Sequence, residues 1–588
     1  MWLPLHSVFV RLRMSSPGRF APFALSEVVR RDTGLVRRRF RPTRRQFVRE
    51  PRAVPSPASV SRHPAPLPTL SRQRLTGMPD SPRFPCGADH RPSPQHRSSV
   101  ILAPPPASPR AMPDLRNLAM QHPGAHSLTF RGKRSETAPM TWGQRAIWKA
   151  IRWLGDDAHY FNIRRIAKIP AGISTEQVET ALSAFVSRHE VLRTRFHEEG
   201  DGPVQEVWAE GALSLTVADA ASGAADDVAV ELARELVGLT FRHAEEWPFR
   251  CALVLQDGRP AVAVLVFSHL AVDFWGVREL ERDLQQLLDG SGPPEPQWQP
   301  LDQARFETEG PGAARGAAAA EYWRRTLHTV PPTLFRTVTG EGRPERFVRL
   351  GMNSPAVAVA TTVLAERCQV STGTVLLAAT AAVLGAYTGH DTVALQLIAV
   401  NRHDERSRRL VAPMVENALF ALNVDDDTFE QTVRRTFLTG MNAYRHAQYD
   451  PSAVDEILDE ARKRSHGALN LGCFFNDKRM HDRWENLPHT DAGPDGLRAL
   501  LCRTTVTFVG SWERQDATFF LHTGYAPDTC LLYLMADTEL IPRHDIDLLL
   551  RAFEILLIDS ATGTLDLAGF RSTRATTSTE KKLGEIAG

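Results

Sequence analysis

The sequence lacks the patterns that identify several common classes of protein. Its 588 residues contain six cysteines, with no CxxC pair and no histidines at zinc spacing, so neither a disulfide scaffold nor a zinc site is predicted. No apolar run reaches the roughly 18–20 residues of a membrane-spanning helix, and the longest candidate, 375–386, predicts a buried helix. The Walker-type signature GxxxxGK, HExxH and GxSxG are also absent, which removes the usual signatures of nucleotide-driven, zinc-protease and α/β-hydrolase chemistry.

The first ten residues lack the features of a secretory signal. They are apolar, but no basic region precedes them and no small-residue cleavage site follows them. The few cysteines suit a reducing compartment. These features together predict a cytoplasmic protein without a membrane partner.

The net charge is close to zero because two oppositely charged segments cancel. Lys and Arg number 70 against 68 Asp and Glu, yet residues 1–134 hold 24 basic and 6 acidic side chains, while the rest of the chain holds 46 basic and 62 acidic ones. The first segment also carries 21 of the 41 prolines. Because such a composition cannot build a packed core, we predict a disordered Arg/Pro-rich leader over residues 1–134.

Three hypotheses account for this leader. It is an Arg-rich arm for nucleic acid or another anionic surface, a transit peptide, or a stretch translated from a start codon placed too far upstream, with Met112, Met120 or Met140 as the true start. Arms that bind phosphate usually mix lysine and stacking aromatic residues with arginine, and neither is prominent here. The third hypothesis is therefore favoured, and no nucleic-acid partner is expected.

From Met140 onward the pattern changes to alternating helices and strands. Thr141 and Ser174 are predicted N-caps, and Gln177 gives the second one the spacing of a capping box. Further helices are expected at 317–327, 355–367, 372–387, 429–444 and 541–558. Strands are expected at 161–169, 191–196, 250–255, 261–268, 392–400, 469–475, 504–508, 518–522 and 531–535. A polar Gly/Pro-rich stretch at 289–316 is predicted to connect two similar α/β halves.

One of these strands delivers a histidine to a strand-to-helix turn. The apolar run 261–268 leads into His269, and Asp273 follows before a helix with one apolar face. A histidine at a strand end that is held by a carboxylate is well placed for general base catalysis. The HxxxD spacing alone is weak evidence because it recurs at His197 and His446, but only His269 lies in such a turn.

Three further motifs occur in an order typical of one family. Residues 140–148 (MTWGQRAIW) resemble its opening motif. Residues 188–196 (RHEVLRTRF) match RHExLRTxF at every defined position, and this match is the most specific in the chain. Residues 268–274 (SHLAVDF) correspond to HHxxxDG.

Downstream elements follow in the same order. Asn401 and Arg402 are similar to the family's Gly-Arg element, and residues 414–419 are similar to FVNTL. Over about 138–565, the chain resembles the condensation domains of nonribosomal peptide synthetases, which form part of the chloramphenicol acetyltransferase-like superfamily.

The resemblance implies a fold and a domain arrangement. The expected fold is α/β, an α+β sandwich in which two chloramphenicol acetyltransferase-like lobes form a pseudo-dimer with the active site in the cleft between them. An N-terminal lobe over 138–310 and a C-terminal lobe over 311–565 would follow the leader, and 566–588 would form a flexible tail.

The resemblance also implies roles for three residues. His269 corresponds to the family's catalytic histidine. Asp273 and Arg402 are expected to pair across the two lobes, as a device that positions the histidine rather than as a source of net stability.

Four more residues are expected along the substrate channel: Ser268, Phe274, Trp275 and Gly276. Ser268 replaces the first histidine of HHxxxDG, which is not the presumed base. Phe274 replaces its glycine, and we expect the phenyl ring to narrow the channel.

The implied activity is that of a freestanding condensation-type acyltransferase in nonribosomal-peptide-like, specialised-metabolite biosynthesis. It would form an amide between a carrier-bound acyl or aminoacyl thioester and an amine. No metal or permanently bound cofactor is expected, since phosphopantetheine would arrive on a carrier protein supplied in trans. Two alternatives stay open: an O-acyltransferase of the same fold that forms an ester with a hydroxyl acceptor, and an inactive relative that recruits a partner enzyme or carrier protein.

Docking of a carrier protein would require a local basic patch. Carrier proteins are typically acidic, and the chain after the leader is acidic as well, so net charge cannot attract one to the other. A candidate patch is the cluster formed in sequence by Arg402, Arg406, Arg408 and Arg409.

Overall fold

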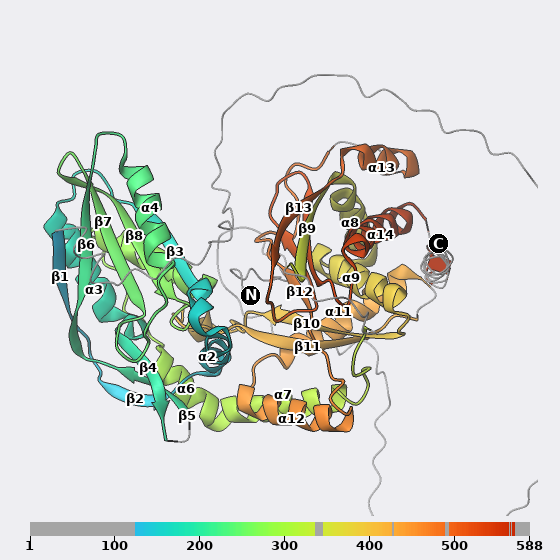
Figure 1. Cartoon of the computed structure of the whole chain (residues 1–588), viewed down its shortest axis with the longest axis horizontal. Helices are drawn as coiled ribbons and strands as arrows, with labels where there is room; N and C mark the ends of the chain where they lie inside the picture. Colours follow the sequence, from blue (N-terminus) through green and yellow to red (C-terminus); the bar gives the residue numbers. More distant parts are fainter. Residues whose placement is uncertain are drawn as a thin grey trace, which may run out of the picture. The chain divides into compact units, whose positions relative to one another are not determined.

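The computed structural model describes most of the chain after residue 123 (Figure 1). The described residues are 124–200, 202–335, 345–425, 428–488 and 493–563, with 565, 567, 569 and 570. Residues 1–123 of the predicted leader and nearly all of the predicted tail lie outside the described residues. The described residues form a mixed α/β fold with two large sheets, which confirms the predicted fold class.

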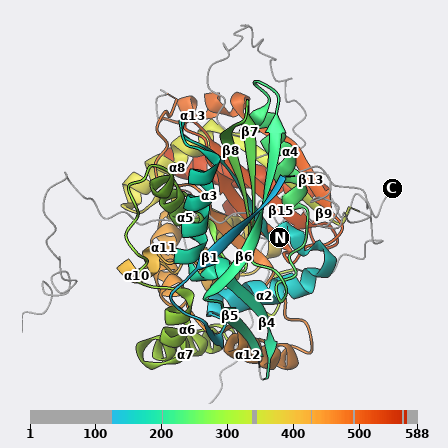
Figure 2. The same cartoon turned by 90° about the vertical axis from the view of Figure 1, so that its left-hand side faces the viewer.

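The N-terminal lobe is built on a five-stranded sheet of order β1-β6-β7-β8-β3. Its strands are β1 (Gly124–Arg131), β6 (Glu210–Ala220), β7 (Phe249–Gln256), β8 (Arg259–Ser268) and β3 (Asn162–Lys168). Helices α3 (Thr175–Arg188) and α5 (Phe274–Leu288) pack on one face and α4 (Ala225–Val237) on the other (Figure 2). Alternate residues of β8 belong to the two separate cores, so both of its faces are buried, and a continuous apolar run results.

Residues 124–134 correct the predicted leader, which therefore cannot extend to residue 134. β1 pairs antiparallel with β6 from Gly124 opposite Val217 to Arg131 opposite Glu210. Leu128 and Phe130, two positions apart on the strand, are buried in the core of the lobe. The strand was not predicted because it is short, has only two such apolar residues and directly follows the Arg-rich segment.

A small antiparallel sheet of order β2-β5-β4 completes the lobe. Its strands are β2 (Glu136–Pro139), β5 (Gly202–Val207) and β4 (Thr194–Glu199). The predicted strand at 191–196 is wrong in its first half, because residues 190–193 form a 3-10 turn and the hydroxyl of Thr194 donates to the Glu190 carbonyl at 2.6 Å. Both predicted caps are confirmed, since Thr141 and Ser174 form capping boxes at α2 (Trp142–Leu154) and α3.

The predicted irregular connection at 289–316 is wrong over its second half. Helices α6 (Pro300–Thr308) and α7 (Gly310–Thr326) occupy that stretch. Pro300 stands at the first helical position, where its missing N–H is no loss. Gly312 lets α7 pass over α6, because a Cβ there would lie 1.8 Å from the Phe306 carbonyl oxygen. The proline and glycine that suggested a loop thus mark the start of one helix and a close approach between two.

The C-terminal lobe is built on a seven-stranded sheet of order β11-β10-β12-β14-β15-β9-β13. Its strands are β9 (Phe347–Ser354), β10 (Thr392–Ala399), β11 (Glu416–Asn423), β12 (Cys473–Asp477), β13 (Thr505–Trp512), β14 (Phe519–Gly524) and β15 (Cys530–Asp537). Helices α8 (Pro355–Cys368), α9 (Thr372–Thr388), α11 (Phe429–Arg445) and α14 (Arg543–Thr562) share one large core with alternate residues of these strands. The other face of the sheet is not part of that core.

Helix α12 (Pro451–Arg464) connects the C-terminal lobe to α2 of the N-terminal lobe. Arg145 on α2 pairs with Asp450, the N-cap of α12, at 3.1 Å, and Lys149 pairs with Asp455. No single helix among the described residues is long and apolar enough to cross a membrane, although α8 and α9, bent by 105° from each other, pass that test as a pair.

A buried histidine fixes the end of strand β8. His243 lies between Phe196 and Trp148, and its Nε2 is 2.8 Å from the Ser268 hydroxyl. Burial, with a smaller effect from the Arg250 charge, lowers the pKa of His243 to about 4.

This pKa predicts how acid destabilises the protein. Below pH 6.5 the unfolded chain protonates residue 243 while the native state does not, so the free energy of unfolding falls as the pH drops from 6.5 towards 4. Between pH 7.5 and pH 5, His243 should account for about 2 kcal/mol of that loss. Urea unfolding at both pH values should show a smaller loss for His243→Gln than for the wild type. The exposed His328→Gln serves as the control, and equal losses in all three proteins would contradict the prediction.

Candidate functional site

The turn between β8 and α5 holds the predicted catalytic histidine in a fixed backbone. The His269 N–H donates to the Phe161 carbonyl at 3.0 Å, and the Ala271 N–H donates to the Ser268 carbonyl at 3.0 Å. Asp273 is the N-cap of α5 and accepts from the Gly276 N–H at 2.8 Å. The predicted strand-to-helix turn is therefore present.

The His269 imidazole is almost fully buried. Its ring centre lies 5.9 Å from that of Phe161, and Nδ1 has no hydrogen-bond partner among the described residues. Burial lowers the pKa of His269 below its usual value, while the Asp273 charge acts in the opposite direction. The neutral imidazole, which is the form that can accept a proton, is therefore the stable form at neutral pH.

Asp273 and Arg402 form a buried ion pair between the two lobes, as predicted. Arg402 Nη2 donates to Asp273 Oδ1 at 2.8 Å, and the second carboxylate oxygen accepts from the Met414 N–H at 3.1 Å. The guanidinium also donates to the carbonyls of Ser407, Leu410 and Ala412. Hydrogen-bond partners thus surround the carboxylate and both Nη atoms of the guanidinium, as a buried ion pair requires, while Nε of Arg402 has no partner among the described residues.

Two of the predicted channel residues lie in packed contacts. The Ser268 hydroxyl contacts His243 and accepts from the Leu270 N–H at 3.2 Å, and the residue is 1% exposed. A Cβ on Gly276 would lie 3.4–3.6 Å from Asp273 and the backbone of Val411 and Ala412, so Gly276 lies against the C-terminal lobe. These contacts do not test the channel role of Ser268 and Gly276, which stays a prediction.

Phe274 and Trp275 remain as candidates for the channel. Both are half-buried, and their rings meet edge to face with centres 5.6 Å apart. The Arg278 guanidinium carbon lies 5.9 Å from the Phe274 ring centre. The phenyl ring that replaces glycine is thus packed at the first turn of α5.

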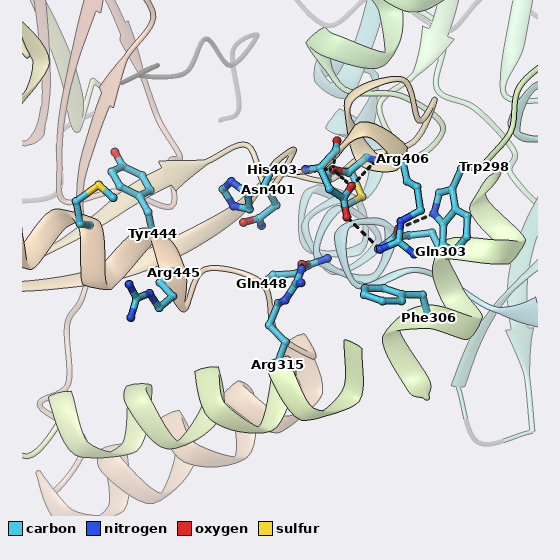
Figure 3. A pocket seen from close by; sticks show the side chains of 14 residues that line it. Trp298, Gln303, Phe306, Arg315, Asn401, His403, Arg406, Tyr444, Arg445 and Gln448 are labelled. Atoms are coloured by element: carbon cyan, nitrogen blue, oxygen red, sulfur yellow. Dashed lines mark hydrogen bonds and ion pairs between the residues drawn. The ribbon is translucent and has the colours of Figure 1, made fainter. Parts of the chain in front are cut away.

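A cavity of about 390 Å³ lies beside the ion pair and was not predicted (Figure 3). Asn401, which precedes Arg402, and Ser407, whose carbonyl accepts from Arg402, line it together with side chains of α6, α7 and α11. None of the six predicted residues from 268 to 276 lines it. Asn401 has a left-handed backbone (φ 55°) and a buried Oδ1 without a partner among the described residues. The asparagine in place of the glycine of the Gly-Arg element was the available signal.

The four arginines of the cluster predicted for docking differ in exposure and in partners. Arg402 is buried in the ion pair, Arg406 pairs with Asp404 and lies over Trp298, and Arg409 pairs with Glu279 on α5 at 3.4 Å. Arg408 is exposed like Arg406 and Arg409, so three of the four arginines lie at the surface and only Arg402 is buried.

Within the part of the chain that the structure describes, no group of three or more His, Cys, Asp or Glu side chains is arranged to hold a metal ion.

Comparisons with known proteins place this geometry in a family. The family model described as "Condensation domain" matches residues 134–491. A polyketide synthase-nonribosomal peptide synthetase of Pyricularia grisea is 24% identical over 57% of this chain, which spans 8% of that protein. The SgcC5 protein of Streptomyces globisporus has a similar structure, with a TM-score of 0.53 and 19% identity over 73% of this chain and all of that one.

A second solved structure is the X-domain in complex with OxyB from teicoplanin biosynthesis. Its TM-score is 0.53, with 18% identity over 73% of this chain and 94% of that one. At these identities the two structures show a shared fold and no more. Since the family model covers more than half of the sequence, the chain belongs to the condensation domain family.

Proposed function

We propose that this protein is a condensation-type acyltransferase of nonribosomal-peptide-like biosynthesis. It joins an acyl or aminoacyl group, carried as a thioester on a carrier protein supplied in trans, to an amine. The observation that carries the proposal is the position of His269, in a strand-to-helix turn that is held across the two lobes by the Asp273–Arg402 pair, in a chain of the condensation family.

The reaction needs one proton acceptor. The amine nitrogen attacks the thioester carbonyl, the new C–N bond forms, and the C–S bond breaks. His269, neutral because it is buried, takes the proton from the attacking nitrogen and returns it to the departing thiolate. No redox or metal-dependent step is part of this scheme, and phosphopantetheine enters as part of the carrier-bound substrate.

Asp273 acts in this scheme as a positioning residue. Its two oxygens accept from Arg402, Gly276 and Met414, so the carboxylate is fully engaged. It holds the turn and favours the imidazolium form that appears when His269 takes a proton.

Ester formation is the first alternative, because the same histidine would serve a hydroxyl nucleophile supplied by the substrate. The second alternative is an inactive relative that recruits a partner. Phe274 and Ser268, which depart from HHxxxDG, favour it, and so does the similarity to an X-domain solved in complex with OxyB.

Loss of His269 should separate catalysis from recruitment. With a loaded carrier and an amine, His269→Ala should form product about 10²–10⁴-fold more slowly than the wild type, since general base assistance is lost. Product mass over time gives the rate. The control is His328→Ala on the surface. Equal rates for both variants would refute the role of His269, and carrier binding without product from the wild type would favour the recruiter.

The role of Asp273 predicts a shift in the pH profile. Asp273→Asn removes a charge that raises the pKa of His269, so the acidic limb of the rate profile should move to lower pH. The same variant leaves Arg402 buried without a counter-charge and should lose about 3–5 kcal/mol of stability. The double variant Asp273→Asn/Arg402→Met should recover part of that stability while keeping the shifted profile. If the double variant regains stability but its pH–rate profile is not shifted, the role of Asp273 is purely structural.

The ring of Phe274 predicts a limit on substrate size. If the ring narrows the channel, Phe274→Gly should keep the fold and accept bulkier acyl groups or turn over faster. Competition between short and branched acyl carriers, read by product mass, measures the range. Trp275→Gly, the adjacent half-buried ring, is the comparison. An unchanged substrate range and rate in Phe274→Gly would remove the constriction from the proposal.

A further inference from the structure

The face of the C-terminal sheet away from α8, α9 and α14 carries a group of basic side chains. Strand register places Asn476 of β12 beside His522 of β14, and His522 beside Tyr533 of β15. Arg349 of β9 lies opposite Met535, two positions farther along β15 on the same face. Lys478 follows β12 directly; the Arg349 charge acts on Lys478, and the Lys478 charge acts on His522. We call Arg349, Asn476, Lys478 and His522 the basic row.

Three members of the basic row are deeply buried, and each has one nitrogen without a hydrogen-bond partner. Arg349, Asn476 and His522 are 3%, 2% and 5% exposed. Among the described residues, Nε of Arg349, Nδ2 of Asn476 and Nδ1 of His522 have no partner, and the Arg349 Nη2 contact is the Met535 sulfur at 3.8 Å. Buried groups of this kind are normally satisfied, so each of these atoms needs an acceptor.

The carboxylates near these strands are already engaged. Asp477 accepts from Arg479 at 2.8 and 2.6 Å, and Asp537 accepts from Arg346 at 2.9 and 2.6 Å. No carboxylate of the described residues forms an ion pair with Arg349 or Lys478. The row therefore combines two cations and two further donors with no anion.

The pKa values of these side chains are consistent with positive charge that has no anionic partner. Burial, and then the Arg349 charge, lower the pKa of Lys478 to about 7, while burial lowers that of Arg349 to about 10. The pKa of His522 lies well below its usual value for the same reasons. An uncompensated buried charge is strongly destabilising, and a bound anion would remove that penalty.

Aromatic rings border the row. The Arg349 guanidinium carbon lies 4.6 Å from the Trp512 ring centre, and the Tyr533 ring stacks on His522 at 5.0 Å. Phe520 lies 5.6 Å from His522. These three rings are half-buried, so they offer partly accessible apolar surface next to the unpaired donors.

We propose that the basic row binds the carboxylate of an apolar organic acid. Arg349 and Lys478 pair with the carboxylate, and the Asn476 amide and the Nδ1–H tautomer of His522 donate to it. The apolar part of the acid lies against Phe520, Tyr533 and Trp512. This binding does not depend on acyl transfer, so it is measured on the protein alone.

Calorimetry with 3-phenylpropionate and its neutral analogue 3-phenylpropanamide tests the proposal. The acid should bind at least about tenfold more tightly than the amide, because the charge-assisted hydrogen bonds require the carboxylate. Binding at pH 8 should take up protons, since the bound anion favours charged Lys478, and titration in buffers of different ionisation enthalpy measures that uptake. Equal binding of acid and amide, or no binding of the acid, would overturn the proposal.

The variant Lys478→Met tests the contribution of the basic row to binding and should not destabilise the fold. Removal of an unpaired charge should leave the unfolding temperature of the free protein unchanged or higher, while affinity for the acid falls about tenfold and proton uptake disappears. Lys463→Met makes the same change on the exposed end of α12 and should alter neither. Unchanged affinity in Lys478→Met would exclude the row as the site, and inorganic phosphate binding as tightly as the acid would exclude an apolar acid as its ligand.

Discussion

The ion pair between Asp273 and Arg402 is the interaction on which the rest of the site depends. It joins residues 129 positions apart and ties the turn that carries His269 to a loop of the other lobe. Asp273 accepts three hydrogen bonds, while Arg402 is held by three backbone carbonyls. Because both charges are buried, the lobes cannot separate at this point without exposing or stranding them. The pair therefore fixes geometry more than it adds stability.

Two buried arginines of this chain have different surroundings. Arg402 has a carboxylate and carbonyl oxygens around it, whereas Arg349 has an aromatic ring and a sulfur atom. In the first arrangement, carboxylate and carbonyl oxygens accept from both Nη atoms of Arg402 and only Nε has no partner among the described residues, which suits a structural joint. The second leaves donors unused at a site bordered by aromatic rings, which is the arrangement expected where a ligand supplies the missing charge.

Local patterns predicted the elements whose signals lie close together in the sequence. Helix α2 begins directly after Thr141, as that predicted cap indicated, and the apolar run of β8 led to His269 as expected. Failures occurred where composition misled. The Arg-rich leader masked β1, and Pro300 with Gly312 suggested a loop where two helices pack closely. The contact of the Ser268 hydroxyl with His243 could not be read from the motif position of Ser268.

The basic row could not be predicted from any segment alone. Its members lie on three strands and one strand end that the chain order separates widely, and only the strand register brings them to one face. One local signal does exist. In β9, the residues facing the helices are apolar, whereas Arg349 occupies an alternate position that is buried nonetheless. In a strand with one apolar face, a charged residue on the opposite face normally indicates that this face is exposed to solvent. The burial of Arg349 is therefore visible only in the structure, and it is this burial that identifies the site.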